Sequence, residues 1–199
     1  MRVALGLKAH SGWAALVTIG WERAGHHLVD RRRIELISDR DPEWPGQPYH
    51  AADGKPPAQA QRIVERGIAD ARTRAGAELR AALARVREAG HELIACAVLT
   101  PTPLPDWTLG QILAVHLRMH QAEGVLYPDA LLRAAEVCGI SAQAIAQKTL
   151  QQTAQVVFAK FSTPVVGEIA AFGKLVGAPW GADQKQASLA AAIALAARR

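Results

Sequence analysis

The chain has 199 residues, of which 50% are hydrophobic and 21% are charged, and its formal net charge at pH 7 is +5. This length and composition exclude a disordered or fibrous chain, and we expect a single globular domain over residues 1–199. The positive charge is compatible with a polyanionic partner, although the arginines are spread over many segments instead of forming one basic run.

The cysteines and the lengths of the apolar runs predict a cytoplasmic protein without a membrane segment. Cys96 and Cys138 lie in apolar surroundings without metal-binding or redox spacing, so we expect both to be reduced core residues of a cytoplasmic protein. Lys8 and His10 interrupt the apolar N-terminus before it could serve as a signal sequence. The alanine-rich run at 189–197 is far shorter than the about 20 residues that span a bilayer, and no membrane segment is expected.

The N-terminal quarter predicts three strands followed by a loop. Val3–Leu7 and Trp13–Ile19 are short apolar runs joined through Gly12, which predicts a β-hairpin. His27–Ile37 predicts a third strand, and its charged, ragged alternation is typical of a sheet edge. Residues 38–57 hold five prolines and two glycines, so we expect a loop there and treat it as a candidate lid.

A long helix and a buried strand come next. Apolar residues recur at helical period over Ala58–Ala89. The continuous apolar run Leu93–Leu99, bounded by Gly90 and Pro101, predicts a central strand buried on both faces.

The rest of the chain is predicted to be mainly helical. Asp106 or Thr108 caps a helix that continues to Tyr127, where Pro128 is expected to begin a new turn or a kink. The elements expected after it are a helix to Cys138, a fifth strand over 140–145, helices over 149–161 and 165–176, and a last helix from Asp183 to the end.

The helix ending at Tyr127 carries a polar interruption of its apolar stripe, at His116, His120 and Glu123. At about 100° per residue, the second and third of these lie about 40° and 20° from the first, so all three share one face. Burying them is unfavourable unless they find partners. They form either a site for one divalent ion, such as Zn²⁺, Mn²⁺ or Mg²⁺, or a hydrogen-bonded polar seam between helices.

Further candidates lie in the two turns that precede the long helix. His10 is either a base or ligand, or simply an exposed hairpin residue, whereas Ser11 is expected only to satisfy turn geometry. Tyr49 and His50 form a polar-aromatic pair in the proline-rich loop, which is a candidate cover for a pocket.

Lys8 is a charged residue in a strand that is otherwise mainly apolar. If its side chain points inward, it needs Glu123, Asp183 or another acid as a partner, and such a pair would replace a metal ion's positive charge. If it points outward, no role follows.

Two stretches carry a resemblance to a known fold. Val-Ala-Leu-Gly-Leu-Lys-Ala-His-Ser-Gly-Trp-Ala-Ala-Leu-Val at 3–17 and Asp-Gln-Lys-Gln-Ala-Ser-Leu-Ala-Ala-Ala-Ile-Ala-Leu at 183–195 resemble the first strand and the last helix of RuvC-type Holliday-junction resolvases. The resemblance implies an α/β, ribonuclease H-like fold, in which flanking helices cover a mixed five-stranded sheet and the C-terminal part is all helical.

The resemblance also implies a site. Nucleases of that superfamily hold divalent ions with carboxylates from the first strand, the central strand and the final helix. Here Lys8 stands at the first of these positions and Cys96 falls near the second, which leaves Asp183; an acid at a helix start also simply complements the helix dipole. Two-ion phosphodiester hydrolysis needs three or four acids, so this chain departs from the pattern.

A second resemblance is to an uncharacterised family of small bacterial proteins. It rests on the stretches Lys-Ala-His-Ser-Gly-Trp, Pro-Tyr-His-Ala-Ala, His-x3-His-x-Ala-Glu-Gly and Pro-Trp-Gly-x-Asp-Gln-Lys. This resemblance implies a shared site and names no activity.

We predict a nucleic-acid-associated protein that contacts DNA or RNA, either as a divergent phosphodiester hydrolase or as a catalytically silent binder. Candidate catalytic residues are Lys8, His10, His50, Glu123 and Asp183; candidate metal ligands are His116, His120 and Glu123; candidate phosphate contacts are Arg31, Arg32, Arg33 and Lys185. The alternatives are a small-molecule metal-dependent hydrolase or binding module, and an interaction protein whose histidines are structural. A homodimer remains open.

Overall fold

The computed structural model describes residues 1–22, 25–38, 46–159 and 165–198. Within these residues a mixed five-stranded sheet has the strand order β3-β2-β1-β4-β5. The first three strands are antiparallel neighbours, whereas β4 is parallel to both β1 and β5. The strands are β1 (Arg2–His10), β2 (Trp13–Glu22), β3 (Gly25–Glu35), β4 (Glu92–Thr100) and β5 (Ala142–Ala146).

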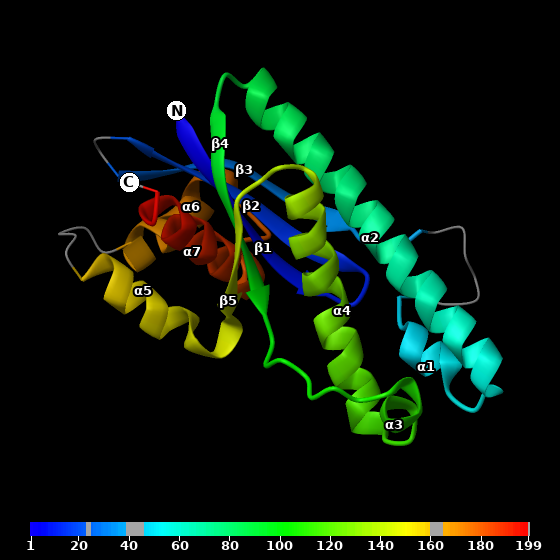
Figure 1. The fold of residues 1–199 in the computed structure, drawn as a ribbon. Helices are drawn as coiled ribbons and strands as arrows, with labels where there is room; N and C mark the ends of the chain where they lie inside the picture. The colour runs from blue at the N-terminus through cyan, green and yellow to red at the C-terminus, as the bar shows by residue number, and fades with distance from the viewer. Residues whose placement is uncertain (23–24, 39–45, 160–164, 199) are drawn as a thin grey trace.

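Helices cover both faces of this sheet (Figure 1). One face carries the long α2 and α4, and the other carries α7, with α5 and α6 beside it. The short α1 and α3 pack against α2 and α4 beyond the strands. The helices are α1 (Pro48–Ala52), α2 (Pro57–Glu88), α3 (Leu109–Leu113), α4 (His116–Val137), α5 (Leu150–Phe158), α6 (Val165–Val176) and α7 (Ala182–Ala196), with a 3₁₀ turn at Gln147–Thr149.

The alanine-rich α7 lies flush against β1. A side chain on Gly6 would overlap the backbone carbonyl oxygen of Ala187, so glycine is required for this approach. Residues 187–195 of α7 are buried. Small side chains on both elements therefore decide how closely the start of α7 approaches the end of β1.

The predicted order of strands and helices is confirmed, with shifted boundaries. The first hairpin, the edge position of β3, the long helix, the buried β4, the fifth strand and the helix at 165–176 all form. The loop predicted at 38–57 needs correction, because α1 forms within it, with Pro48 in its first turn where a missing N–H costs nothing. Residues 39–45 of that candidate lid lie outside the described part of the chain.

The helix predicted over 109–127 is two helices. Thr108 is the N-cap of α3, and its hydroxyl and the side chain of Gln111 form a reciprocal capping box. Val115 is extended, with φ −140° and ψ 114°, so the chain changes direction before α4 begins at His116. Leu109, at the start of α3, therefore does not share a helix face with the histidines.

Of the new turn or kink expected at Pro128, the new turn does not form, because α4 runs through this residue to Val137. An interior proline costs about 3 kcal/mol. Leu126, Tyr127 and Leu131 are buried around it, and each buried large side chain contributes about 1.5–3 kcal/mol. Burial of this face outweighs the lost backbone hydrogen bond.

Two further expectations concern the state of the cysteines and the presence of a membrane-spanning helix. Cys96 is buried in the core and Cys138 is half-buried, and both are free thiols. Burial raises the pKa of the Cys96 thiol to about 12, which keeps it protonated and unreactive. None of the helices in the described ranges combines the length and apolar character needed to cross a bilayer.

Candidate functional site

The C-terminal ends of β1, β4 and β5 meet at one edge of the sheet, because these strands are parallel. Open α/β sheets place ligand sites outside this edge. A pocket lies there, lined by the end of β1, the segment after β4, the turn after β5 and one side of α4. Its lining residues are Lys8, Ala9, His10, Ser11, Leu99, Pro101, Glu123, Gly124, Pro128 and Gln147.

Lys8 lines this pocket, and its hydrogen-bond partner is a neutral amide instead of the acid that an inward-pointing lysine is expected to need. Its ammonium group donates a hydrogen bond to the side-chain oxygen of Gln147, at 2.5 Å. Burial lowers the pKa of Lys8, and the negative charge of Asp183 partly opposes that shift. Gln147 was not identified from the sequence; its position two residues after the predicted fifth strand was the available signal.

Asp183 opens α7 and reaches back to the end of β1. Its carboxylate lies 2.9 Å from His10 Nε2. The His10 ring stacks on Trp13, with centroids 4.4 Å apart. The Arg33 guanidinium lies over the Trp13 ring, 4.1 Å from its centroid. We call Lys8, His10, Gln147 and Asp183 the edge cluster. Trp13, which supports it, was not identified from the sequence.

The predicted phosphate contacts divide between the two faces of the sheet. Lys8 and Arg33 both pair in register with Ala15, so they share the α7 face, whereas the intervening Arg32 faces the opposite way. Arg31 donates to backbone carbonyls of residues 176, 178 and 179. Alternation along a strand therefore prevents residues 31–33 from acting as one contiguous surface.

The arginines on β3 also have acidic partners on their own strand. Arg32 pairs with Asp30 at 2.8 Å, and Arg33 pairs with Glu35 at 2.6 Å. Exposed pairs of this kind are weak and exchange readily with other anions. Lys185, on the first turn of α7, is exposed.

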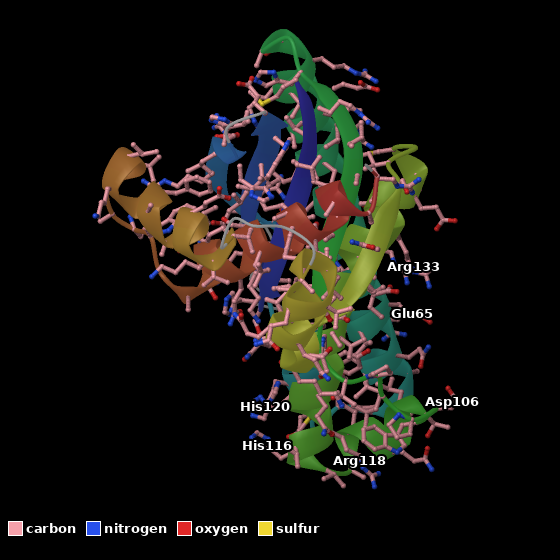
Figure 2. All side chains as sticks on the ribbon, turned by 90° about the vertical axis from the view of Figure 1, so that its left-hand side faces the viewer. Glu65, Asp106, His116, Arg118, His120 and Arg133 are labelled. Atoms are coloured by element: carbon pink, nitrogen blue, oxygen red, sulfur yellow. The ribbon has the colours of Figure 1, made fainter. Side chains whose placement is uncertain are left out.

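A second cluster forms where α1 meets α4. His116 and His120 lie one turn apart at the start of α4, with their Nε2 atoms 3.1 Å apart (Figure 2). The His50 ring comes from α1, with its centroid 5.1 Å from that of His116 and 4.5 Å from that of His120. One ring nitrogen from each of the three lies within 4.8 Å of the others.

Glu123 stands behind His50 in this arrangement. Its Oε2 lies 2.9 Å from His50 Nδ1, and its Oε1 accepts a hydrogen bond from the His50 backbone N–H at 3.2 Å. Glu123 is only 2% exposed, whereas His116 and His120 are exposed. We call His50, His116, His120 and Glu123 the histidine cluster.

The position of His50 depends on a buried contact between α4 and the chain before α1. Tyr127 donates its hydroxyl hydrogen bond to the Gly46 carbonyl at 2.6 Å, and burial raises its pKa, so it stays a donor. Tyr49 is half-buried against the core, and burial together with the charge of Glu123 raises its pKa.

The histidine cluster differs from the predicted ligand set in two respects. His50 takes the third position next to the helix pair, and Glu123 contacts His50. The two helix histidines are exposed, where sequence analysis expected burial. The break at Val115 explains the exposure, since it places His116 at a helix end and not in mid-stripe.

The edge cluster does not fit the carboxylate-held ions that the resemblance implies. Lys8 places a positive charge at the first-strand position, Gln147 is neutral, and Asp183 is engaged with His10. A pair of hard cations requires several carboxylate oxygens at one point. Asp183 contacts His10, and the converging histidines are His50, His116 and His120.

Comparison with known proteins gives a fold but no sequence family. No protein-family model and no curated protein sequence matches the chain. The chain is similar to several solved structures. Among them are "T. thermophilus RuvC in complex with Holliday junction substrate", at 14% identity and TM-score 0.53 over 97% of this chain and 92% of that one, and "Thermus thermophilus RuvC structure", at 15% identity and TM-score 0.52 over 96% and 91%. At such identities the likeness establishes the fold, which confirms the predicted ribonuclease H-like architecture.

Proposed function

Proceeding from the ribonuclease H-like fold that it shares with RuvC, we propose that this chain is a nucleic-acid-associated protein that contacts DNA or RNA at the edge cluster. The observation that carries the proposal is Lys8, a cation built into the first strand and directed into the pocket at the carboxyl edge of the sheet. A RuvC of the same fold was solved with a Holliday junction substrate, which supports nucleic acid as the ligand class.

Charge on the α7 face supports a phosphate contact. Lys8 and Arg33 lie on that face two strands apart, a separation of about 10 Å. Lys185 adds an exposed cation at the start of α7. Lysine and arginine side chains supply most phosphate contacts, and such contacts bind without reading the base sequence.

Of the two alternatives, phosphodiester hydrolysis and catalytically silent binding, the edge cluster favours silent binding. Lys8 supplies a fixed positive charge where the fold's nucleases are expected to hold a metal ion, so a phosphate can bind there without that ion. His10, held by Asp183, is the group that would transfer a proton if hydrolysis occurred at this edge.

Metal-assisted hydrolysis of a phosphodiester or a small molecule is the second candidate, and the histidine cluster favours it. Three imidazoles that converge from α1 and α4 can hold one divalent ion. Such an ion polarises a phosphoryl or carbonyl oxygen and lowers the pKa of a bound water.

Fluorescence anisotropy tests the leading proposal with labelled single-stranded DNA, duplex DNA, a four-way junction and RNA, in a chelating buffer at about 50 and about 200 mM salt. Arg33→Gln should reduce the slope of log affinity against log salt by about 1. Arg32→Gln, one residue away on the opposite face, is the matched control and should leave the slope unchanged. Absence of any binding at the lower salt concentration would refute the proposal.

A further inference from the structure

We propose that His50, His116 and His120 form a site for one zinc-type transition-metal ion with an open coordination position, and that Glu123 orients His50 from outside the ligand set. The inference deepens the second candidate function by naming the class of ion. It does not depend on nucleic-acid binding at the edge cluster.

Distances within the histidine cluster suit a tetrahedral ion. Zinc–nitrogen bonds of about 2.0–2.1 Å place two tetrahedral ligand nitrogens about 3.3 Å apart. His116 Nε2 and His120 Nε2 are already 3.1 Å apart. All three ligand nitrogens lie within 4.8 Å of one another, so a side-chain movement of up to about 1.5 Å by His50 completes the set.

The contacts of His50 leave one nitrogen for a ligand. Nδ1 lies 2.9 Å from Glu123 Oε2, and with its proton on this nitrogen, facing the carboxylate, the ring keeps the Nε2 lone pair for an ion. Both ring nitrogens of His50 and the Oε2 atom of Glu123 are buried without a hydrogen bond among the residues that the structure describes. A buried acceptor of this kind is unfavourable unless something binds it.

Glu123 acts on the ion through His50. A carboxylate that accepts the second ring N–H of a metal-bound histidine holds the ring orientation and raises its basicity. Glu123 is held in turn by the backbone N–H of His50, and it is almost fully buried, so its carboxylate has a defined position. It is therefore a positioning residue.

The donor atoms select the class of ion. Three neutral imidazoles suit zinc, copper, nickel or iron, whereas Mg²⁺ prefers oxygen ligands in an octahedral arrangement. Exposure of His116 and His120 leaves a coordination position facing solvent. Three protein ligands with one open position are typical of a catalytic zinc site and not of a structural one.

Titration calorimetry of the untagged protein with Zn²⁺ tests the site, and Co²⁺ absorption reports the coordination geometry. We expect one ion per chain and a tetrahedral Co²⁺ spectrum. His116→Ala and His120→Ala should each weaken Zn²⁺ binding by at least about 100-fold, since each removes a ligand. His27→Ala, which removes a half-exposed imidazole on β3, is the matched control and should leave affinity unchanged.

Glu123→Gln tests the positioning role separately. It should weaken Zn²⁺ binding about 10–100-fold while keeping one ion per chain, as expected for loss of an outer carboxylate. Circular dichroism of each variant shows whether the fold is retained, and the exposed His116 and His120 variants serve the test even if Glu123→Gln unfolds.

Three results would overturn the inference: no Zn²⁺ binding by the wild type, unchanged binding by the His116→Ala/His120→Ala double variant, or equal affinity for Mg²⁺. These measurements contain no nucleic acid, and the anisotropy assay contains a chelator. Failure of the metal site and failure of the proposed nucleic-acid function are therefore separate results.

Discussion

The edge cluster and the histidine cluster lie on either side of Glu123, which lines the pocket of the first and contacts His50 in the second. In the edge cluster Lys8 donates to Gln147, and one imidazole, that of His10, lies 2.9 Å from the Asp183 carboxylate. In the histidine cluster three imidazole rings converge, with one ring nitrogen of each within 4.8 Å of the others. A lysine that lines a pocket suits contact with a phosphate, whereas three converging imidazoles suit coordination of an ion.

The largest expected effect is a loss of stability when α7 is displaced. The edge cluster includes Asp183 on α7, whereas the histidine cluster has no residue on this helix. Gly6→Ala places a methyl group against the Ala187 carbonyl, so α7 must move away from β1 and take Asp183 with it. We expect a loss of about 3 kcal/mol, at the upper end of overpacking effects, because the obstacle is backbone. Urea denaturation measures it.

Gly124→Ala is the matched control for that substitution. Gly124 lies inside α4, and its Cβ position meets nothing within 4 Å. Alanine there should stabilise the protein by about 0.5–1 kcal/mol through helix propensity. Equal stability of the Gly6→Ala variant and the wild type would contradict the close approach of α7.

Lys8→Met tests whether the half-buried charge of Lys8 destabilises the folded protein. The folded-state pKa of Lys8 lies below its ordinary value, so the charged lysine destabilises the fold at neutral pH, and this penalty disappears as pH rises to 10.5. Lys8→Met should therefore be more stable at pH 7, by less than about 1 kcal/mol because the side chain is only half-buried. Urea denaturation of both proteins from pH 7 to 10.5 should show this gain shrinking.

Asp183→Asn should have a smaller effect in the same cluster. The side chains of Asp183 and His10 are 30% and 36% exposed, so loss of the contact between them should cost about 0.2–1 kcal/mol. Because the charge of Asp183 raises the Lys8 pKa, the substitution should lower that pKa further. Side-chain NMR titration of Lys8 checks the direction, and an upward change would argue against the assigned contact.

The smallest expected effect is on the histidine cluster. His116→Ala and His120→Ala should each change stability by less than about 0.5 kcal/mol in a chelating buffer, since both side chains are exposed. A structural polar seam predicts the opposite, a clear loss without any ion. Thermal unfolding with and without Zn²⁺ separates the two, because only the wild type should gain stability from the ion.

Local patterns were sufficient for most of the fold. Periodicity identified the long helix, the hairpin and the buried β4, and the likeness to RuvC confirms the predicted architecture. Patterns failed where two local preferences compete. Pro128 disfavours a helix locally, yet α4 continues because its neighbours are buried against the sheet.

Sequence alone determined the chemistry available at both clusters: the i, i+4 histidine pair, a lysine in an apolar strand, and an acid at the start of the last helix. Tertiary structure decided which of these groups meet. The extended Val115 and the buried Tyr127–Gly46 hydrogen bond bring His50 to the helix pair, while α7 docks on Gly6 and delivers Asp183 to His10. Contacts between residues so far apart in the chain depend on packing of whole elements, which no local pattern encodes.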